Sequence, residues 1–125
     1  MTVTPGDQID FVELPGRRSG DPLRSVDSDS SLRIVRLTGG TQRFAHRHPH
    51  SEEIIYVRTG SGTVFIDGVR TAVAAGDTVR IPPDAAHATV PDPGQSMDLV
   101  CFFPHPQLAD NIEETTIDVM TEGEQ

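Results

Sequence analysis

The sequence contains no lysine, since all ten of its basic residues are arginine. This absence excludes Schiff-base chemistry at a lysine side chain and a lysine general base. The exclusive use of arginine also favours a high-GC, bacterial genome. The chain has a single cysteine, Cys101, so an intrachain disulfide cannot form. A reducing cytoplasm is therefore the compartment that we expect.

Long hydrophobic runs are also missing, and no segment approaches the roughly 20 apolar residues that a membrane span needs. The N-terminal MTVTPGDQID lacks a basic region followed by an apolar one, so we expect no signal peptide. The net charge is −9, and residues 81–125 contain nine acidic residues but no arginine. Because phosphate contacts need a basic surface, we expect neither nucleic acid nor anionic membrane as a partner. We interpret the acidic C-terminal region as a feature that favours solubility.

Ten prolines and eleven glycines separate a series of short apolar segments, a pattern typical of all-β proteins. The length favours one domain, which we expect to be a sandwich or barrel. Asp67-Gly68 predicts a type I′ hairpin turn. Residues 15–31 are predicted to be a loop, 106–112 a turn of helix, and 115–120 a last strand or an exchanged arm. The other predicted strands are 9–14, 32–37, 42–48, 52–58, 63–67, 69–73, 77–82, 87–91 and 97–103.

Three of the five histidines lie within residues 46–50, shortly before Glu52 and Glu53. In a strand, side chains two residues apart share a face, so His46 and His48 can bind one ion together. One of the two glutamates must face the same interior. Two imidazoles and a carboxylate suit borderline metals. The alternative is a pair of hydrogen-bonded strand histidines beside an exposed acidic turn.

A second segment, GDTVRIPPDAAHATVP at residues 76–91, brings one histidine, His87, into an apolar strand after two prolines. A lone histidine is more often a packed core residue than a ligand. Together, however, the two segments resemble the paired motifs of the cupin superfamily, G-x5-H-x-H-x3–4-E-x6-G and G-x5-P-x-G-x2-H-x3-N. The spacing of the first motif selects Glu53 over Glu52. The matching residues are Gly40, His46, His48, Glu53 and Gly60 in the first motif, and Gly76, Pro82 and His87 in the second.

The sequence departs from the second motif at Asp84, where the family usually has glycine, and at Pro91, where it usually has asparagine. Aspartate adopts left-handed backbone conformations more readily than most residues, so we expect the turn before His87 to be preserved. The resemblance covers residues 32–103. It implies a small double-stranded antiparallel β-barrel, jelly-roll-like in form. The flanking regions are then an N-terminal arm and flexible loop (1–31) and an acidic C-terminal tail (104–125).

The resemblance also implies a mononuclear metal site with His46, His48, Glu53 and His87 as ligands. The cofactor would be one divalent ion per chain: iron, manganese, zinc, nickel or cobalt. For His50, a solvated surface position is an alternative to a role in supporting the ligands.

Strand alternation predicts which side chains line a substrate pocket beside this site. Gln42 either bonds to the backbone or contacts substrate, and Cys101 is expected to be a small buried apolar residue. From the last strand, the alternative register would point Val100 and Phe102 inward instead. The predicted pocket residues are Gln42, Phe44, Ile55, Val57, Thr89, Cys101 and Phe103.

Two functions fit these features. The first is a metal-dependent enzyme acting on a small organic metabolite; small cupins perform oxygenation, isomerisation, cyclisation, decarboxylation and lyase reactions. The alternative is a non-catalytic module that binds a metal or small ligand. Because cupins commonly dimerise through terminal strands, we also expect a homodimer that uses residues 9–14 and 115–120.

Overall fold

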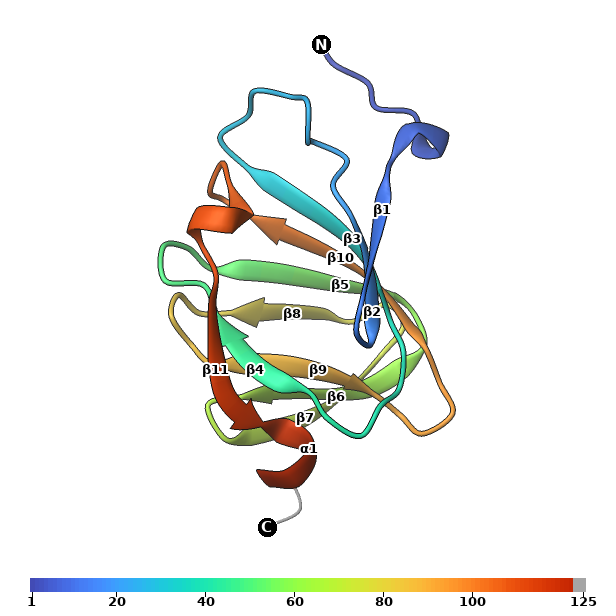
Figure 1. Cartoon of the computed structure of the whole chain (residues 1–125), viewed down its shortest axis with the longest axis vertical. Helices are drawn as coiled ribbons and strands as arrows, with labels where there is room; N and C mark the ends of the chain where they lie inside the picture. The colour runs from blue at the N-terminus through green and yellow to red at the C-terminus, as the bar shows by residue number, and fades with distance from the viewer. Residues whose placement is uncertain (123–125) are drawn as a thin grey trace.

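Two antiparallel β-sheets face each other in the computed structural model, which describes residues 1–122 (Figure 1). The first sheet has the strand order β1-β2-β3-β10-β5-β8, and the second has the order β11-β4-β9-β6-β7. This arrangement confirms the all-β, antiparallel barrel class. The strands of the first sheet are β1 (Phe11–Leu14), β2 (Arg17–Gly20), β3 (Ser31–Leu37), β10 (Met97–Phe103), β5 (Glu53–Thr59) and β8 (Thr78–Ile81). Those of the second are β11 (Glu113–Asp118), β4 (Phe44–Arg47), β9 (His87–Pro91), β6 (Ser61–Ile66) and β7 (Val69–Ala74).

Among residues 1–122, helical structure is confined to three short segments: η1 (Gly6–Gln8), η2 (Leu108–Asp110) and α1 (Val119–Glu122). The position of η2 agrees with the helical turn predicted over 106–112. Across residues 1–122, no helix combines the length and apolar character that a membrane crossing requires.

Both flanking regions contribute strands to the sheets of the same chain. The predicted loop at 15–31 is wrong in part, because β2 lies within it and pairs with both β1 and β3. The side chains of Ile9 and Phe11 pack closely against the end of β2 because residue 20 is a glycine. A Cβ at Gly20 would lie only 2.8 Å from both side chains. At the other end of the chain, β11 pairs with β4, so residues 115–118 form a last strand. The division at 32 and 103 therefore does not coincide with the limits of the two sheets, and residues 123–125 of the predicted tail lie outside the described residues.

Two turns have the backbone conformations that the sequence predicts. Asp67 and Gly68 have positive φ angles of 45° and 85°, as a type I′ turn requires between β6 and β7. Asp84 has a φ of 65°, which is the left-handed conformation expected where the family motif has glycine. The departure from the motif at this position therefore leaves the turn before β9 in place.

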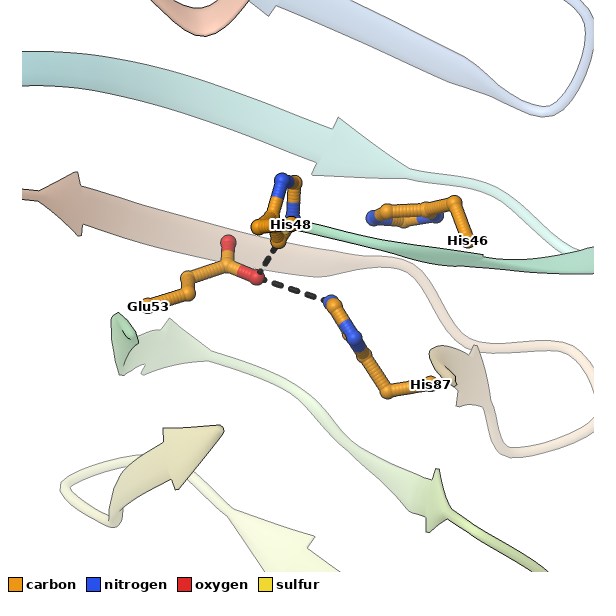
Figure 2. Close-up of side chains that lie close together, drawn as sticks. All are labelled: His46, His48, Glu53 and His87. Carbon is orange, nitrogen blue, oxygen red and sulfur yellow. Dashed lines mark hydrogen bonds and ion pairs between the residues drawn. The ribbon is translucent and has the colours of Figure 1, made fainter. Parts of the chain in front are cut away.

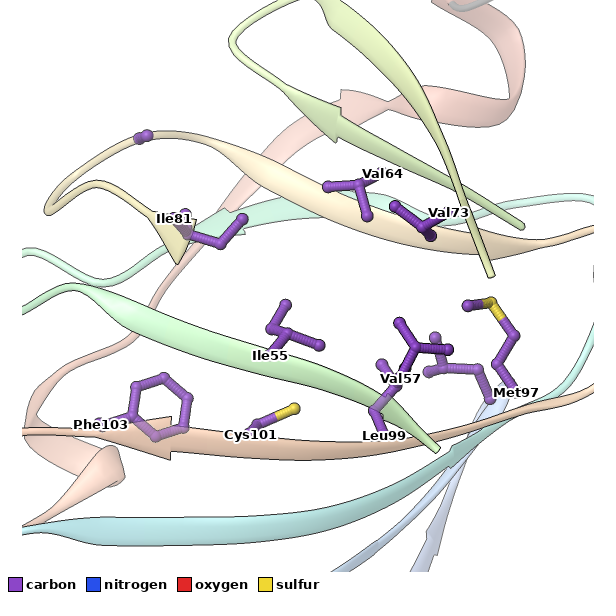
Figure 3. Packing of buried hydrophobic residues seen from close by; sticks show 11 residues of the cluster. Ile55, Val57, Val64, Val73, Ile81, Met97, Leu99, Cys101 and Phe103 are labelled. Atoms are coloured by element: carbon purple, nitrogen blue, oxygen red, sulfur yellow. The ribbon is translucent and has the colours of Figure 1, made fainter. Parts of the chain in front are cut away.

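The space between the sheets is filled mainly by apolar side chains (Figure 3). Period-two alternation on β5 and β10 directs one set of side chains inward. Ile55 lies opposite Cys101 and Val57 lies opposite Leu99 in the strand register. The same alternation on β5 directs Glu53 into the barrel interior, where it is only 4% exposed. A buried carboxylate in an apolar barrel needs compensating partners, and these lie at one end of the barrel.

Candidate metal centre

His46, His48, Glu53 and His87 converge at one end of the barrel interior (Figure 2). Each offers one potential ligand atom, and these atoms all lie within 4.8 Å of one another. The three imidazole ring centroids are 4.5 to 5.1 Å apart. Three imidazoles and one carboxylate at this spacing can hold one metal ion.

The strands and the turns between them position these four residues. His46 on β4 lies directly opposite His87 on β9 in the strand register. The backbone N–H of Asp84 donates a hydrogen bond of 2.8 Å to the carbonyl of His48, which connects the turns that follow β4 and β8. The two histidine-bearing segments, far apart in sequence, are thus fixed relative to each other by backbone bonds.

Hydrogen bonds at Nδ1 orient two of the imidazoles. Nδ1 of His48 is 2.7 Å from the carbonyl oxygen of Asn111, and Nδ1 of His87 is 2.9 Å from that of Ala85. A carbonyl only accepts, so both Nδ1 atoms carry the proton and donate it. In the neutral ring, Nε2 then presents a lone pair to the interior. This is the ring orientation that a metal-binding histidine requires.

The Nε2 atoms point at an acceptor. Oε1 of Glu53 is 2.9 Å from Nε2 of His87 and 3.2 Å from Nε2 of His48. Nε2 of His48 is buried and has no hydrogen-bond partner among the described residues. Lone pairs of neutral imidazoles directed at a carboxylate oxygen repel it unless a cation lies between them. The donor set therefore fits a bound metal ion on the chemistry of its own atoms.

Burial and neighbouring charges determine the protonation of His46 and Glu53 in a way that favours cation binding. Burial, followed by the neighbouring charge of His87, lowers the pKa of His46 to about 3, so this imidazole is neutral near pH 7. Burial alone would raise the pKa of Glu53. When no cation is bound and the rings of His48 and His87 carry a proton at Nε2, their hydrogen bonds and positive charge outweigh this effect, and the pKa falls to about 2. The cluster thus combines an ionised carboxylate with a neutral imidazole at ordinary pH.

Glu53, and not Glu52, faces the cluster. Glu52 lies on the outer face, where its carboxylate accepts a hydrogen bond of 2.6 Å from Arg80. His50 also lies outside the cluster. It is exposed, and its ring stacks on that of His105 with a centroid distance of 5.6 Å.

Asn111 supports the cluster, although it lies outside both motifs and was not predicted from the sequence. Its side chain is fully buried and accepts a hydrogen bond of 2.7 Å from the backbone N–H of His50. Its amide nitrogen donates to Oγ of Ser51 at 2.8 Å, and its carbonyl orients His48. Asn111 comes from the segment between η2 and β11, outside both motifs. The one signal in the sequence is that Asn111 is the chain's single asparagine and lies in an otherwise acidic segment.

A cavity of about 130 Å³ opens beside the four residues. Of the predicted pocket residues, the structure places Phe44, Ile55, Thr89, Cys101 and Phe103 on its wall. Gln42 and Val57 are not on the wall. Gln42 precedes β4 and is exposed, whereas Val57 is buried in the apolar core farther along β5. Val100 and Phe102 face outward, which selects the register with Cys101 inward.

Cys101 is buried beside the site. Burial first, and the charge of Glu53 second, raise the pKa of the thiol. The thiol is therefore held protonated, which is consistent with the expected small buried apolar residue.

Three arginines on the cavity wall were missed by the sequence analysis: Arg17 on β2, Arg33 on β3 and Arg43 just before β4. Arg17 was missed because β2 lies in the predicted loop. For Arg33 and Arg43, alternation shows which neighbours share a face but does not show that a wall position is occupied by a charged side chain.

Comparisons with known proteins identify the family. The Cupin domain model matches residues 33–103, more than half of the chain. The protein belongs to the cupin family. Dimethylsulfoniopropionate lyase DddW from Ruegeria pomeroyi is 42% identical over 83 residues, which cover 66% of this chain and 54% of that protein.

Solved structures are similar in fold. A PAC13 variant from Streptomyces, solved with uridine, gives a TM-score of 0.78 at 17% identity and covers 99% of this chain and 97% of that one. Oxalate decarboxylase from Lactobacillus farciminis gives a TM-score of 0.74 at 22% identity, covering 86% of this chain and 34% of that one. The matched regions span between 20% and 58% of the length of the curated relatives.

Proposed function

We propose that this protein is a metal-dependent cupin enzyme that acts on a small organic metabolite. The observation that carries the proposal is the position of the four-residue cluster, three of whose members are buried and which borders a cavity. A site closed on all sides by protein ligands would suit a structural ion, whereas an accessible face leaves room for a substrate. His46, His48, Glu53 and His87 would hold the ion.

The residues around the cavity supply little chemistry of their own. Apart from the four cluster residues, the ionisable side chains that the described part of the chain places on the wall are three arginines and Cys101. Arginine stays protonated, and the thiol is held protonated by burial, so neither group is a general base at neutral pH. A bound divalent ion would supply the missing chemistry by polarising a substrate oxygen or acidifying a water. The chain's part is to hold the ligands rigidly, to surround the substrate and to exclude bulk water.

The reaction class that we propose is oxygenation, isomerisation or cyclisation of the metabolite in the cytoplasm. Two of the relatives are named for reactions on small carboxylates, dimethylsulfoniopropionate and oxalate. These names support a small polar substrate. The volume of the cavity, about 130 Å³, is below the roughly 300 Å³ at which sites for drug-sized ligands begin, and it also favours a small molecule.

The test is to load the purified protein separately with iron, manganese, zinc, nickel and cobalt, and to incubate it with a panel of small metabolites. Oxygen consumption reports oxygenation, and proton NMR reports isomerisation or cyclisation. Turnover that requires metal and disappears in His87→Ala would support the enzyme. Binding without turnover across the panel would instead favour the alternative function, a non-catalytic module.

We also propose that two copies associate by sheet extension. β1 is the end strand of the first sheet, and its Val12 and Leu14 are 57% and 40% exposed. An end strand offers unpaired backbone groups to another strand. Light scattering should give a dimer mass for the wild type and a monomer mass for Val12→Pro. A monomeric wild type would contradict this proposal.

A further inference from the structure

The cavity wall has an excess of positive charge. Among residues 1–122, three guanidinium groups, those of Arg17, Arg33 and Arg43, share the wall with a single carboxylate, that of Glu53. Arginine does not lose its proton in proteins. A divalent ion in the cluster would increase the excess further. Charge of one sign that lines a partly enclosed cavity attracts a ligand of the opposite sign.

The three arginines differ in what neutralises them. Arg33 is already engaged, because it donates to the carbonyl of Leu32 at 2.9 Å and forms an ion pair with Asp21 at 3.2 Å. Arg43 donates to the carbonyls of Thr38 and Gly16 at 2.7 and 3.3 Å. Those two bonds fix the position of the guanidinium, but neutral carbonyls leave its charge uncompensated.

Arg17 is the least compensated of the three. Within residues 1–122, its side chain takes part in no hydrogen bond or ion pair, although it is partly buried. Arg17 lies beside Arg43, because the Arg43 guanidinium donates to the carbonyl of Gly16, the residue before Arg17. Both side chains are on the wall of the cavity that the four-residue cluster also lines.

The strand geometry makes this placement specific. On β2, Arg17 and Ser19 both line the cavity, while Arg18 between them lies outside it. Arg18 packs over the ring of Phe11, 4.4 Å from its centroid, and pairs with Glu13 at 3.4 Å. Two adjacent arginines thus have opposite environments, and only the inward one lacks a partner in the described chain.

We propose that Arg17 and Arg43 bind a carboxylate of the substrate, so that the ligand of this site is a small organic carboxylate. The inference rests on the proposed function, which it deepens by naming the substrate class. Guanidinium groups bind carboxylates through charge-assisted, often bidentate hydrogen bonds. The remaining wall is largely apolar, with Val35, Leu37 and Leu99 among its members, and accepts a short carbon skeleton.

The experiment measures binding of succinate to the zinc-loaded full-length protein by calorimetry, with the uncharged diamide succinamide as the matched ligand. Arg17→Gln and Arg43→Gln are each expected to weaken succinate binding by roughly tenfold to a hundredfold, as the loss of a charge-assisted hydrogen bond requires. Succinamide should bind more weakly than succinate to the wild type, and neither substitution should weaken it further.

Arg18→Gln is the control, because it removes the same charge from the next residue but outside the cavity. It should leave the affinity for succinate unchanged. Equal losses in Arg17→Gln and Arg18→Gln would overturn the proposal in favour of a general effect of net charge. Unchanged affinity in both Arg17→Gln and Arg43→Gln would also overturn it. If inorganic phosphate binds in an Arg17-dependent manner and succinate does not, the assignment to carboxylates is wrong.

Zinc content, measured on the same samples, separates this inference from the proposed function. Unchanged succinate affinity in variants that retain zinc would contradict the carboxylate site and leave the metal-dependent enzyme standing. A wild type that binds no metal would contradict the enzyme. In that case Arg17-dependent binding of succinate by the metal-free protein would still support the carboxylate site.

Discussion

The two ends of the barrel interior are built from the same strands but contain different kinds of side chain. On β5, the inward residues run from Glu53 at the open end through Ile55 to Val57 at the closed end. On β10, they run from Phe103 to Met97, which is fully buried. Apolar packing at the closed end holds the strands in register. Because the strands are continuous, this register also fixes where the four residues of the cluster meet at the open end.

The comparison shows how a small protein can bury charged and polar groups. The closed end excludes water and supplies stability, whereas the open end contains polar groups that contact one another and backbone carbonyls and that could hold a cation. Changes at the closed end should therefore reduce stability and leave the metal site intact. Changes at the open end should weaken metal binding and have a smaller effect on stability.

The largest effect on stability is expected from Met97→Ala. Met97 fills the closed end, in contact with Gly60 and Gly62, and its truncation leaves a cavity. The free energy of unfolding should fall by about 2–5 kcal/mol, as measured by chemical denaturation. The same variant should still bind metal at the wild-type stoichiometry. Phe102→Ala, on the outer face of the same strand, is the control and should lower the free energy of unfolding by less.

Asn111→Ala should weaken metal binding by about tenfold to a hundredfold, because the side chain fixes the loop whose carbonyl orients His48. Titration against a chelating dye measures the affinity. Unfolding of the chelator-treated protein measures any loss of stability separately. Gln107→Ala, exposed in the same segment, should have wild-type affinity. An Asn111→Ala protein that is destabilised yet binds metal normally would show that this residue has only a structural role.

The metal-free protein should lose stability as the pH falls. The pKa of His46 is about 3 in the folded protein, against an ordinary value of 6.5, so below pH 6.5 the unfolded chain binds a proton that the folded one does not. Stability is therefore lost on acidification from about pH 6.5 toward 3, and Glu53 adds to the loss below its ordinary pKa of 4.5. In His46→Gln, the slope of unfolding free energy against pH between these limits should be shallower by up to about 1.4 kcal/mol per pH unit. Equal slopes would mean that His46 is protonated in the folded protein.

The smallest effect concerns the turn before His87. Asp84 is exposed and has a φ of 65°, which alanine adopts with more strain than aspartate or glycine. Asp84→Ala should reduce stability by about 1 kcal/mol, whereas Asp84→Gly should stay within about 0.5 kcal/mol of the wild type. Thermal unfolding of the three proteins tests this order. Equal losses would show that the turn is held by something other than its backbone conformation.

Much of the open end could be predicted from the sequence, because its signals are local. The spacing of His46, His48 and Glu53 follows strand alternation, and the spacing of the paired motifs brought in His87. Asn111 and Arg17 could not be predicted in this way. Asn111 contacts the cluster across a long separation in sequence. Arg17 lies on β2, which has the composition of a loop. Strand alternation shows which face of a strand a side chain is on, but not how far along the barrel it lies. The prediction that Val57 lines the cavity was wrong for this reason, since Val57 lies in the core.

The most direct test of the account is the metal content of protein purified without chelator or nickel affinity resin, measured by plasma mass spectrometry. The account predicts one ion per chain in the wild type and in His50→Ala, whose imidazole lies outside the cluster. It predicts loss of the ion in His48→Ala and His87→Ala. A wild type that contains no metal and takes up none on incubation, or variants that all retain it equally, would contradict the central claim.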